Sequence, residues 1–576
     1  MNKLWVIKST ANSDKIELLK SQLNIDESLA TLLVLRGVKS FDEAKAFFRP
    51  SIDDLHDPFL MKDMDKAVDR LIEAIRKDEK ILIYGDYDVD GTTSVALVYS
   101  FLIKYYQNID FYIPDRYLEG YGVSEKGIDY AVDNDCKLVI ALDCGIKAVK
   151  KVNYAKNKNV DFIICDHHTA GDGLPEAVAC LDPKRDDCSY PDKNLSGCGV
   201  GFKFLQAFCR KMNLLDEEKR LCDYLDLLAV SIASDIVPIV GENRVLAAIG
   251  LKQLNTNPRV GLKSIMKIAG MEDKEFIISD IVFKIGPRIN AAGRIESGRE
   301  AVELLISENE SYASPLSVNI NAFNETRKDL DREITLEALD IISHSERLTN
   351  RKTTVLYNQN WHKGVIGIVA SRLTETYYRP TVILTESRGF AAGSARSVEG
   401  FDLYKAIDAC SDLLETFGGH TYAAGLTLKI ENIDLFAQRF EQVVSETILP
   451  EQLIPKIEID TELNFNQITP KFYRILKQFM PFGPGNMTPV FITRNVMDYG
   501  TSKLVGKDRS HLKLELISKH SGTIVQGVGF SMGKHFDRIK NNELFDVCYT
   551  VEENFFNGKT SLQLNVRDIR FNDLSD

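Results

Sequence analysis

The sequence has no apolar run long enough to cross a bilayer, which takes about 20 residues. The longest such run near the middle, Leu227 to Val240, is interrupted by Asp235 and Pro238. The opening MNKLWVIKST lacks the apolar stretch and the small-residue cleavage site of an export signal, and the ten cysteines form no CxxC pair. These absences predict a cytoplasmic protein with no membrane segment.

An excess of positive charge is missing as well. The 83 Asp and Glu residues outnumber the 71 Lys and Arg residues, for a formal net charge of −12. A protein that coats nucleic acid by bulk electrostatics needs many cations to displace counterions, so this mode of binding is excluded. A nucleic-acid substrate is not excluded, because carboxylates that hold divalent cations add negative formal charge yet present a positive face to phosphate.

The length of 576 residues exceeds what one hydrophobic core organises, and it predicts three or four domains. With 44% hydrophobic and 27% charged residues, the composition is that of an ordinary globular protein. We therefore expect the chain to fold throughout.

A strand, loop and helix pattern begins at residue 81 and recurs over the next 90 residues. The strands are ILIY, KLVIALD and VDFIIC, with helical segments between them. Such units form a mainly parallel sheet with right-handed crossovers, and ligands bind beyond the carboxyl ends of its strands. The polar residues expected at that edge are Asp86, Asp88, Asp90, Asp143, Asp166, His167 and His168.

The second half of the chain changes character twice. Apolar positions spaced at helical intervals over residues 318–343 predict a long connecting helix, and a second α/β segment follows it. After Pro450, short alternating runs such as HLKLELI and SLQLNVRDI predict a small β-barrel. The predicted segments are an N-terminal helical one (1–45), the parallel-sheet domain (46–317), the connecting helix (318–345), the second α/β domain (346–450) and the barrel (451–576).

The motif GDYDVDG places three carboxylates at alternate positions, which suits hard divalent cations. An EF-hand calcium loop has the same start, but Leu97 stands where that loop requires a bidentate Glu. Asp88 and Asp90 also fit the nucleophile motif of haloacid-dehalogenase phosphatases. The later Asp166-His167-His168 favours a two-metal hydrolase instead. A third interpretation is a turn of solvated aspartates.

Four motifs in order, GDYDVDG, LDCGI, CDHH and ASDIVP, resemble those of the DHH family of phosphoesterases. IPDRYLEGYG, GPRINAAGR, WHKGVIGIVASRL, GSARS and GGHTYAAG resemble motifs of its single-stranded-DNA exonuclease branch, over nearly the whole chain. The resemblance implies an α/β fold in which a parallel-sheet DHH domain and an α/β DHHA1 domain are joined by a long helix, with a C-terminal OB-fold β-barrel.

The resemblance also implies a metal centre that holds two divalent ions, Mn²⁺ or Mg²⁺. The implied ligands are Asp88, Asp90, Asp143, His167 and Asp235. His168 would face the substrate phosphate, Asp166 would orient the histidine pair, and Asp86 would assist. For Asp235, a structural role at a helix end is the competing interpretation.

Substrate-binding residues follow from the same resemblance. Arg116, Ser394 and Arg396 would hold a terminal 5′ phosphate through directional hydrogen bonds. Arg288, Asn290 and Arg294 would contact the scissile phosphate or line the cleft, and Gly419 and His420 would approach the substrate backbone. The competing interpretation is that the arginines brace domain interfaces. In the barrel, candidates for base stacking or simple core packing are Phe482, His511, Lys513 and Phe555.

The function implied is a 5′-to-3′ exonuclease that releases mononucleotides from single-stranded DNA in recombination and repair. Its expected partners are single-stranded DNA, a single-strand binding protein and a RecQ-like helicase, and it would act as a monomer. One alternative is a phosphodiesterase of short oligonucleotides or cyclic dinucleotides, against which the extra barrel argues. The other is a catalytically silent DNA-binding replication factor, against which the intact carboxylates argue.

Overall fold

The computed structural model describes residues 3–9, 12–272 and 274–571. These residues form two compact units. The first unit comprises residues 58–235 and 253–455, and the second comprises the described parts of 3–57, 236–252 and 456–571. No helix of the described residues is both long enough and apolar enough to cross a membrane.

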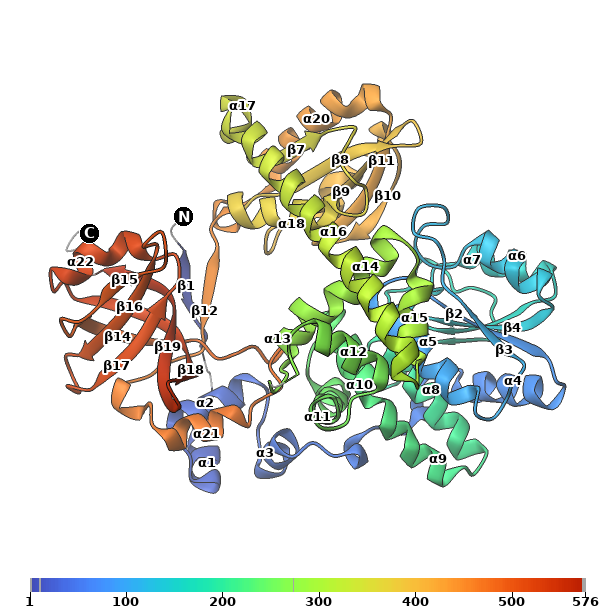
Figure 1. The fold of residues 1–576 in the computed structure, drawn as a ribbon, viewed down its shortest axis with the longest axis horizontal. Coiled ribbons are helices and arrows are strands. Elements are labelled where there is room, and N and C mark those ends of the chain that lie inside the picture. The colour runs from blue at the N-terminus through green and yellow to red at the C-terminus, as the bar shows by residue number, and fades with distance from the viewer. Residues whose placement is uncertain (1–2, 10–11, 273, 572–576) are drawn as a thin grey trace. The chain divides into compact units, whose positions relative to one another are not determined.

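A five-stranded parallel sheet organises the first half of unit one, as predicted (Figure 1). Its strand order is β3-β2-β4-β5-β6, so the edge strands β3 and β6 add to the three strands that the sequence indicated. The bounds are β2 (Lys80–Gly85), β3 (Ile109–Tyr112), β4 (Cys136–Leu142), β5 (Asp161–Cys165) and β6 (Ala179–Leu181).

Both faces of this sheet are buried, which explains why its strands are almost continuously apolar. Leu82 and Tyr84 belong to one core with the helices α6 and α7, while α5 and α8 contact the sheet and each other. The helices are α4 (Met64–Arg76), α5 (Val89–Leu102), α6 (Glu125–Asp133), α7 (Val149–Asn157) and α8 (Gly197–Lys211).

A helical layer completes this half of the unit. A π-helical turn, Ile281–Ile285, leads directly into α14, and π-helical turns are frequent at functional sites. The helices are α9 (Leu215–Arg220), α10 (Leu225–Ser234), α11 (Gly241–Thr256, whose start belongs to unit two), α12 (Val260–Ile268), α13 (Ile278–Asp280), α14 (Gly286–Ile295) and α15 (Gly298–Ile306).

The long helix α16 (Glu310–Ser343) connects the two halves of unit one (Figure 1). It contacts α12, α14 and α15 near its start and α18 further along. It begins eight residues before the predicted start at 318, with Asn309 as its N-cap. Pro315 lies inside the helix. The first turns were not predicted because proline is disfavoured in the interior of a helix.

The second half of unit one is a mixed sheet in the order β10-β11-β9-β8-β7, in which only β7 and β8 pair in parallel. Its strands are β7 (Thr354–Tyr357), β8 (Thr381–Ser387), β9 (Phe390–Arg396), β10 (Leu414–His420) and β11 (Ala423–Leu428). Its helices are α17 (Glu346–Thr349), α18 (Ile366–Tyr377), α19 (Leu403–Asp408) and α20 (Ile433–Thr447).

Unit two is the predicted barrel together with the N-terminal helices. Seven strands follow the order β13-β14-β18-β19-β17-β16-β15, and an additional pairing of β14 with β16 closes the sheet. The strands are β13 (Thr461–Glu462), β14 (Phe491–Asp498), β15 (Lys503–Val505), β16 (His511–Ser518), β17 (Ile524–Gly529), β18 (Phe545–Phe556) and β19 (Lys559–Phe571).

The N-terminal segment shares the hydrophobic core of this barrel. Leu19, Leu29 and Leu33 belong to one buried cluster with Leu514 and Tyr549. A short parallel pair, β1 (Leu4–Ile7) with β12 (Lys456–Ile459), also joins the N-terminal segment to the strand that precedes the barrel. The helices are α1 (Ser13–Leu23), α2 (Glu27–Leu35), α3 (Phe41–Phe48), α21 (Pro470–Lys477) and α22 (Phe536–Lys540).

Candidate active site

Three neighbouring strands of the parallel sheet end at the same edge. β2 pairs with β4 and β4 pairs with β5, all in parallel, so their carboxyl ends meet. The first residues after these strands are Asp86, Asp143 and Asp166. The sheet therefore brings together carboxylates from three distant segments of the chain.

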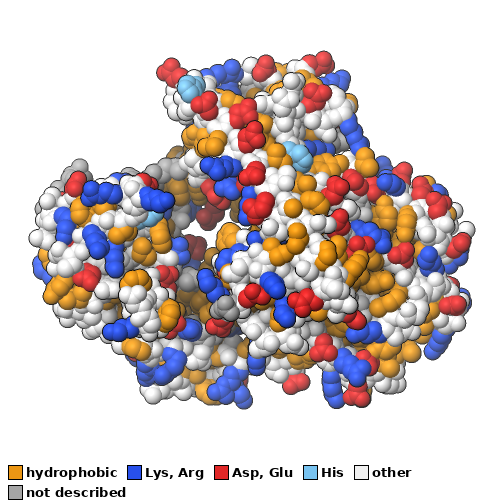
Figure 2. All heavy atoms as spheres, in the orientation of Figure 1, with side chains coloured by type: hydrophobic (Ala, Val, Ile, Leu, Met, Phe, Trp, Pro, Cys, Tyr) orange, Lys and Arg blue, Asp and Glu red, His pale blue; other side chains and the backbone are white. Residues whose placement is uncertain are grey.

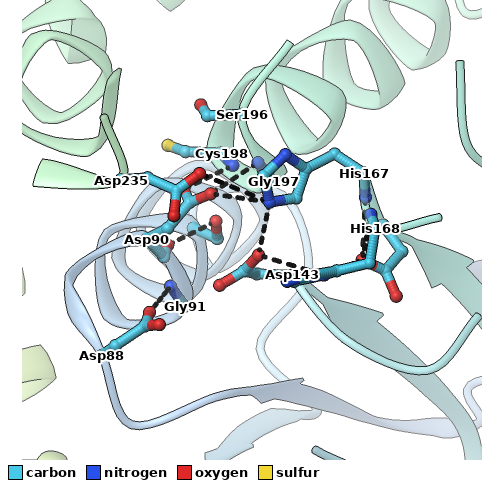
Figure 3. Close-up of polar contacts among 12 residues, drawn as sticks. Asp88, Asp90, Gly91, Asp143, His167, His168, Ser196, Gly197, Cys198 and Asp235 are labelled. Carbon is cyan, nitrogen blue, oxygen red and sulfur yellow. Dashed lines mark hydrogen bonds and ion pairs between the residues drawn. The ribbon is translucent and has the colours of Figure 1, made fainter. Parts of the chain in front are cut away.

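One imidazole nitrogen lies at the centre of this cluster (Figure 3). Nε2 of His167 is 3.2 Å from Oδ1 of Asp143, 3.5 Å from Oδ2 of Asp235 and 3.7 Å from Oδ2 of Asp90. Burial lowers the pKa of His167 to about 4, so the ring is neutral near pH 7 and offers a lone pair. A buried neutral histidine among three carboxylates has the form of a metal site.

Asp90 is held in place by the start of α8. Its Oδ2 accepts a hydrogen bond from Gly197 N (2.6 Å), and its Oδ1 accepts from Cys198 N (2.9 Å) and Ser231 Oγ (2.7 Å) (Figure 3). Position 197 has to be glycine, because a Cβ there would lie 2.6 Å from the Cβ of Asp143. The close approach of α8 thus fixes two predicted ligands at once.

The carboxylates repel one another. Burial, reinforced by Asp90, raises the pKa of Asp143 and of Asp235 well above the ordinary value, and burial with Asp88 does the same for the pKa of Asp86. Asp143 also has a left-handed backbone, with φ of +58°, which is strained for a non-glycine residue. This arrangement costs free energy unless a cation balances it.

The donor set fits divalent metal ions. Two groups of possible ligand atoms each lie within 4.8 Å of one another, Asp143 with both histidines and Asp90 with His167 and Asp235. Among the described residues, Oδ1 of Asp143 and both ring nitrogens of His167 are buried without a hydrogen bond. Asp88 belongs to neither group; its Oδ1 accepts from Gly91 N at 3.0 Å as the N-cap of α5. Mixed carboxylate and imidazole ligands suit Mn²⁺ and Mg²⁺.

Asp166 orients His168. Its Oδ1 lies 2.7 Å from Nδ1 of His168 and also accepts from the backbone N–H groups of both histidines, while its Oδ2 accepts from Ile146 N at 2.9 Å. Burial alone would raise the pKa of Asp166, but the hydrogen bond from His168 and that ring's charge lower it. Burial likewise opposes the charged form of His168, whose pKa is nevertheless raised by Asp166.

Tyr121 completes this chain of contacts, and the sequence analysis did not single it out. Its hydroxyl lies 3.2 Å from Nε2 of His168 and 3.5 Å from the backbone oxygen of Asp143. Desolvation, followed by the charge of Asp143, raises the pKa of Tyr121, so the phenol keeps its proton. The only signal in the sequence was its place in the motif that carries Arg116.

A second cluster of opposite charge lies in the same unit. A cavity of about 300 Å³ is lined by Arg116, Arg294 and Arg396, with Ser394 beside them. The structure therefore brings together the three predicted phosphate-binding residues and adds Arg294, for which contact with the scissile phosphate or the cleft was predicted. Further lining residues that the sequence analysis missed are Tyr87, Tyr117, Lys363, Gly367 and Gly393.

These guanidinium groups are not neutralised by carboxylates. Arg294 donates to the carbonyl of Gly364 at 2.8 Å, Arg396 donates to Ser394 Oγ at 3.0 Å, and Arg116 lies over the ring of Tyr87. Burial, followed by the charge of Arg116, lowers the pKa of Arg294 to about 9. Within the described part of the chain none of the three has an ion pair, so the pocket is suited to an anion.

The other predicted substrate residues lie elsewhere. Arg288 donates to Asn321 Oδ1 on α16 (3.0 Å) and to the backbone oxygen of Lys284, and Asn290 is partly buried on the same helix. Gly419 and His420 end β10, where a Cβ on Gly419 would lie 2.3 Å from the Ala423 oxygen. His420 is exposed at the surface. Partial desolvation lowers its pKa, and the charges of Lys147 and His168 lower the pKa further.

The barrel candidates differ in exposure. Phe482 packs against the core of unit two, whereas the side chain of Phe555 is 74% exposed near the β18–β19 turn. His511 accepts from Ser531 N and contacts the ring of Phe530, and Lys513 is exposed on β16. Figure 2 shows acidic and basic side chains interspersed over the face that it draws.

Comparison with known sequences identifies three domains in this chain. Residues 80–232 match the DHH family, N-terminal domain, residues 350–446 match the DHHA1 domain, and residues 459–568 match the RecJ OB domain. The single-stranded-DNA-specific exonuclease RecJ of Bacillus subtilis is 36% identical over 98% of this chain and 70% of its own length. The RecJ of Escherichia coli is 32% identical over 94% of this chain and 95% of its own length.

This chain belongs to the RecJ family. Among solved structures, RecJ of Thermus thermophilus in complex with Mn²⁺ is similar with a TM-score of 0.84 and 25% identity, over 98% of this chain and 79% of that one. An exonuclease RecJ bound to manganese is 29% identical with a TM-score of 0.59, over 68% of this chain and 96% of that one. The predicted fold class, with DHH, DHHA1 and OB domains, is confirmed, and the RecJ relatives bind divalent metal.

Proposed function

We propose that this chain hydrolyses single-stranded DNA stepwise from its 5′ end, with two divalent metal ions held at the carboxyl edge of the parallel sheet. Membership of the RecJ family makes it a metal-dependent, single-stranded-DNA-specific exonuclease. The observation that carries the polarity is the pocket of unpaired arginines, because a terminal phosphate has the charge and the acceptor oxygens to complete it.

The ligands in this proposal are Asp88, Asp90, Asp143, His167 and Asp235, with Asp86 beside them. When bound, a pair of divalent ions lowers the pKa of a water molecule and stabilises the charge that develops on phosphate oxygens. Asp90, fixed by α8, and the strained Asp143 hold their carboxylates in one orientation before any ion arrives. The ligand geometry is therefore preorganised by the chain itself.

His168 acts on the substrate, and Asp166 acts through His168. Asp166 holds Nδ1 of His168 and stabilises the charged ring, so that Nε2 can donate a hydrogen bond to an oxygen of the scissile phosphate. Arg116, Ser394 and Arg396 bind the 5′ phosphate and measure the first nucleotide from the chain end. Arg288, Asn290, Gly419 and His420 contact the strand beyond it.

The remaining assignments follow from this activity. The five predicted segments correspond to an N-terminal helical region, the DHH domain, the linker helix, the DHHA1 domain and the OB-fold, which binds single strands through Phe555 and Lys513. We propose a monomer that works in the cytoplasm with a single-strand binding protein and a RecQ-like helicase, in recombination and repair.

A direct test uses 3′-labelled single strands with Mn²⁺. The wild-type chain should shorten a linear strand with a 5′ phosphate in single-nucleotide steps and leave a circular strand of the same composition intact. Cleavage of the circle at a comparable rate would contradict an end-dependent mechanism. Faster hydrolysis of a cyclic dinucleotide than of the linear strand would instead favour a small-substrate phosphodiesterase.

A further inference from the structure

One loop touches both charged regions of unit one. The β3–α6 loop (residues 113–124) carries Arg116 into the arginine pocket and Tyr121 to within 3.2 Å of Nε2 of His168. These two residues are only five positions apart in the sequence. The loop is therefore placed to make the state of one region depend on the state of the other.

Between them stands a buried carboxylate that has no role in metal or phosphate binding. The side chain of Glu119 is only 3% exposed. It accepts hydrogen bonds from Tyr112 Oη (3.0 Å to each oxygen), Asp115 N (2.9 Å) and Ser124 Oγ (2.5 Å). Because Tyr112 ends β3 and Ser124 caps α6, this one group joins both ends of the loop.

The donors to Glu119 belong to a wider network. The Asp115 carboxylate accepts from the N–H groups of Tyr117 and Leu118, and Ser124 Oγ accepts from Gly127 N. The loop carbonyl of Gly122 accepts from Tyr84 Oη at 3.0 Å. These internal bonds restrain the loop as one unit, because a buried carboxylate left without donors is costly.

The loop also contacts the second half of unit one. The backbone oxygen of Tyr117 accepts from Arg388 Nη2 at 2.7 Å, and the Tyr117 hydroxyl donates to the backbone oxygen of Arg294. The ring of Tyr117 lies against His362. Residues from both halves of unit one, Arg294 in the first and Arg388 and His362 in the second, therefore hold the segment that follows Arg116.

At the other end of the loop, the Tyr121 hydroxyl contacts Nε2 of His168, the atom that would face the substrate. Nε2 of His168 is the atom that would donate to the scissile phosphate, and the Tyr121 hydroxyl oxygen, 3.2 Å away, can accept that same hydrogen while Nδ1 donates to Asp166. An oxygen of the scissile phosphate has to displace this contact or share it. The free energy of that exchange depends on where the loop holds Tyr121.

We propose that Glu119 is a positioning residue that makes the β3–α6 loop a rigid link, through which a terminal phosphate at Arg116 weakens the hold of Tyr121 on His168. The inference rests on the proposed 5′-end recognition and deepens it. Recognition of the chain end would then raise the rate of hydrolysis as well as the affinity. A pocket that only bound the end would change affinity alone.

The test is a cycle of four single-turnover rates. Single strands that differ only in a 5′ phosphate or a 5′ hydroxyl are given to the wild-type chain and to Tyr121→Phe. The coupling factor is the ratio of the two phosphate effects, and it equals one when the phosphate and the tyrosine act independently. We expect the coupling factor to exceed about threefold in the wild-type background. When the same cycle is measured with Glu119→Gln in every protein, the coupling factor should fall to about one.

A merely structural role for Glu119 predicts a different result. Loss of folded protein would lower all four rates by the same factor and leave the coupling factor unchanged. Tyr112→Phe, which removes one donor to Glu119 and keeps the ring, should lower the coupling factor in the same direction. Glu125→Gln, an exposed glutamate on α6 that pairs with Lys151, is the matched control and should leave it unchanged.

Binding without hydrolysis separates the two proposals. The affinity of a 3′-fluorescent strand is measured by anisotropy in a chelator, with and without the 5′ phosphate. If the wild type distinguishes the two ends and its coupling factor is one, the link through Glu119 is wrong while 5′-end recognition stands. If neither binding nor rate depends on the phosphate, the assignment of the pocket fails, and the coupling fails with it.

Discussion

The two charged regions of unit one carry opposite charges, and in each of them groups of like charge lie close together. At the sheet edge, buried carboxylates crowd together and the pKa values of Asp86, Asp143 and Asp235 rise. In the pocket, arginines crowd together and the pKa of Arg294 falls to about 9. Each region lacks charges of the other sign, and in the proposed function each is completed by a ligand: cations at the first and a phosphate at the second.

The difference between them lies in how they are held. The acidic region is fixed by backbone, through the start of α8 and the strained φ of Asp143. The arginines are held by carbonyl oxygens and an aromatic ring, which leave donors available. Metal ligands need a fixed geometry, whereas a phosphate can be met by guanidinium groups that adjust.

The largest expected effect comes from removing one charge at the acidic edge. Asp143→Asn keeps the size of the side chain, and Asn tolerates the left-handed backbone better than other residues. We expect exonuclease activity to fall by at least about 10³-fold, because a carboxylate of one of the two candidate ligand groups is lost. Rates with saturating Mn²⁺ measure this.

The same variant should be more stable than the wild type when metal is absent, because the substitution relieves repulsion. Thermal unfolding in a chelator and with Mn²⁺ gives the comparison, since a ligand that binds only the folded state raises the melting temperature. An Asp143→Asn protein that is stabilised by Mn²⁺ as much as the wild type would show that Asp143 is not a ligand. Asp129→Asn, at a half-buried site on α6 where the carboxylate pairs with Lys158, is the control.

The next effect concerns the chain end. Arg396→Gln should reduce the preference for a 5′ phosphate over a 5′ hydroxyl by about 10- to 100-fold in kcat/KM, the value of a charge-assisted hydrogen bond. Activity on the 5′-hydroxyl strand should change much less. Arg439→Gln, whose guanidinium pairs with Asp412 on the surface, is a matched control. An equal loss on both strands would place Arg396 outside end recognition.

Much of the fold around the acidic edge could be predicted from the sequence. The strands that end in Asp86, Asp143 and Asp166 could be identified because a parallel sheet is apolar on both faces and its polar residues cluster at one edge. The edge strand β3 was not predicted, because it has only four residues. The first turns of α16 escaped because Pro315 breaks the pattern.

The limits of sequence reasoning at the site are of a different kind. The resemblance to the DHH family singled out Asp90 and His167 as candidate ligands, but nothing local in the sequence indicates that α8 donates two N–H groups to Asp90. The contact of Tyr121 with His168 depends on a loop shape that Glu119 stabilises from inside. Contacts of this kind depend on tertiary packing, which one sequence without relatives does not reveal.

A smaller effect concerns the stability of the acidic edge against pH. The pKa values of Asp86, Asp143 and Asp235 are raised in the folded state, so the folded chain binds more protons than the unfolded chain as the pH falls from neutral. Their contribution to the free energy of unfolding should therefore increase on mild acidification in a chelator. Asp166 has the opposite sign: its pKa is lowered, and its stabilising effect is lost only at more acidic pH.

Unfolding curves between pH 8 and pH 5 measure the difference between wild type and Asp143→Asn. In a chelator the wild type should gain on the variant as the pH falls, by a few degrees, since about 1 kcal/mol corresponds to roughly 2–4 °C in a domain of about 200 residues. With Mn²⁺ present the trend should reverse, because protons compete with the ion. A difference independent of pH would contradict the raised pKa values.

The smallest expected effect comes from Lys363, an exposed cation in the same pocket as the half-buried Arg396. Lys363 lines the cavity, but its side chain is exposed and water screens its charge. We expect Lys363→Gln to raise KM for a 5′-phosphorylated strand by about threefold at low salt, with kcat unchanged, and the effect to disappear at about 0.3 M salt. The effect of Arg396→Gln should persist at that salt concentration, because Arg396 is half-buried and its charge is screened less than that of Lys363. An equal salt dependence of the two variants would mean that the pocket acts by bulk charge rather than by directed hydrogen bonds.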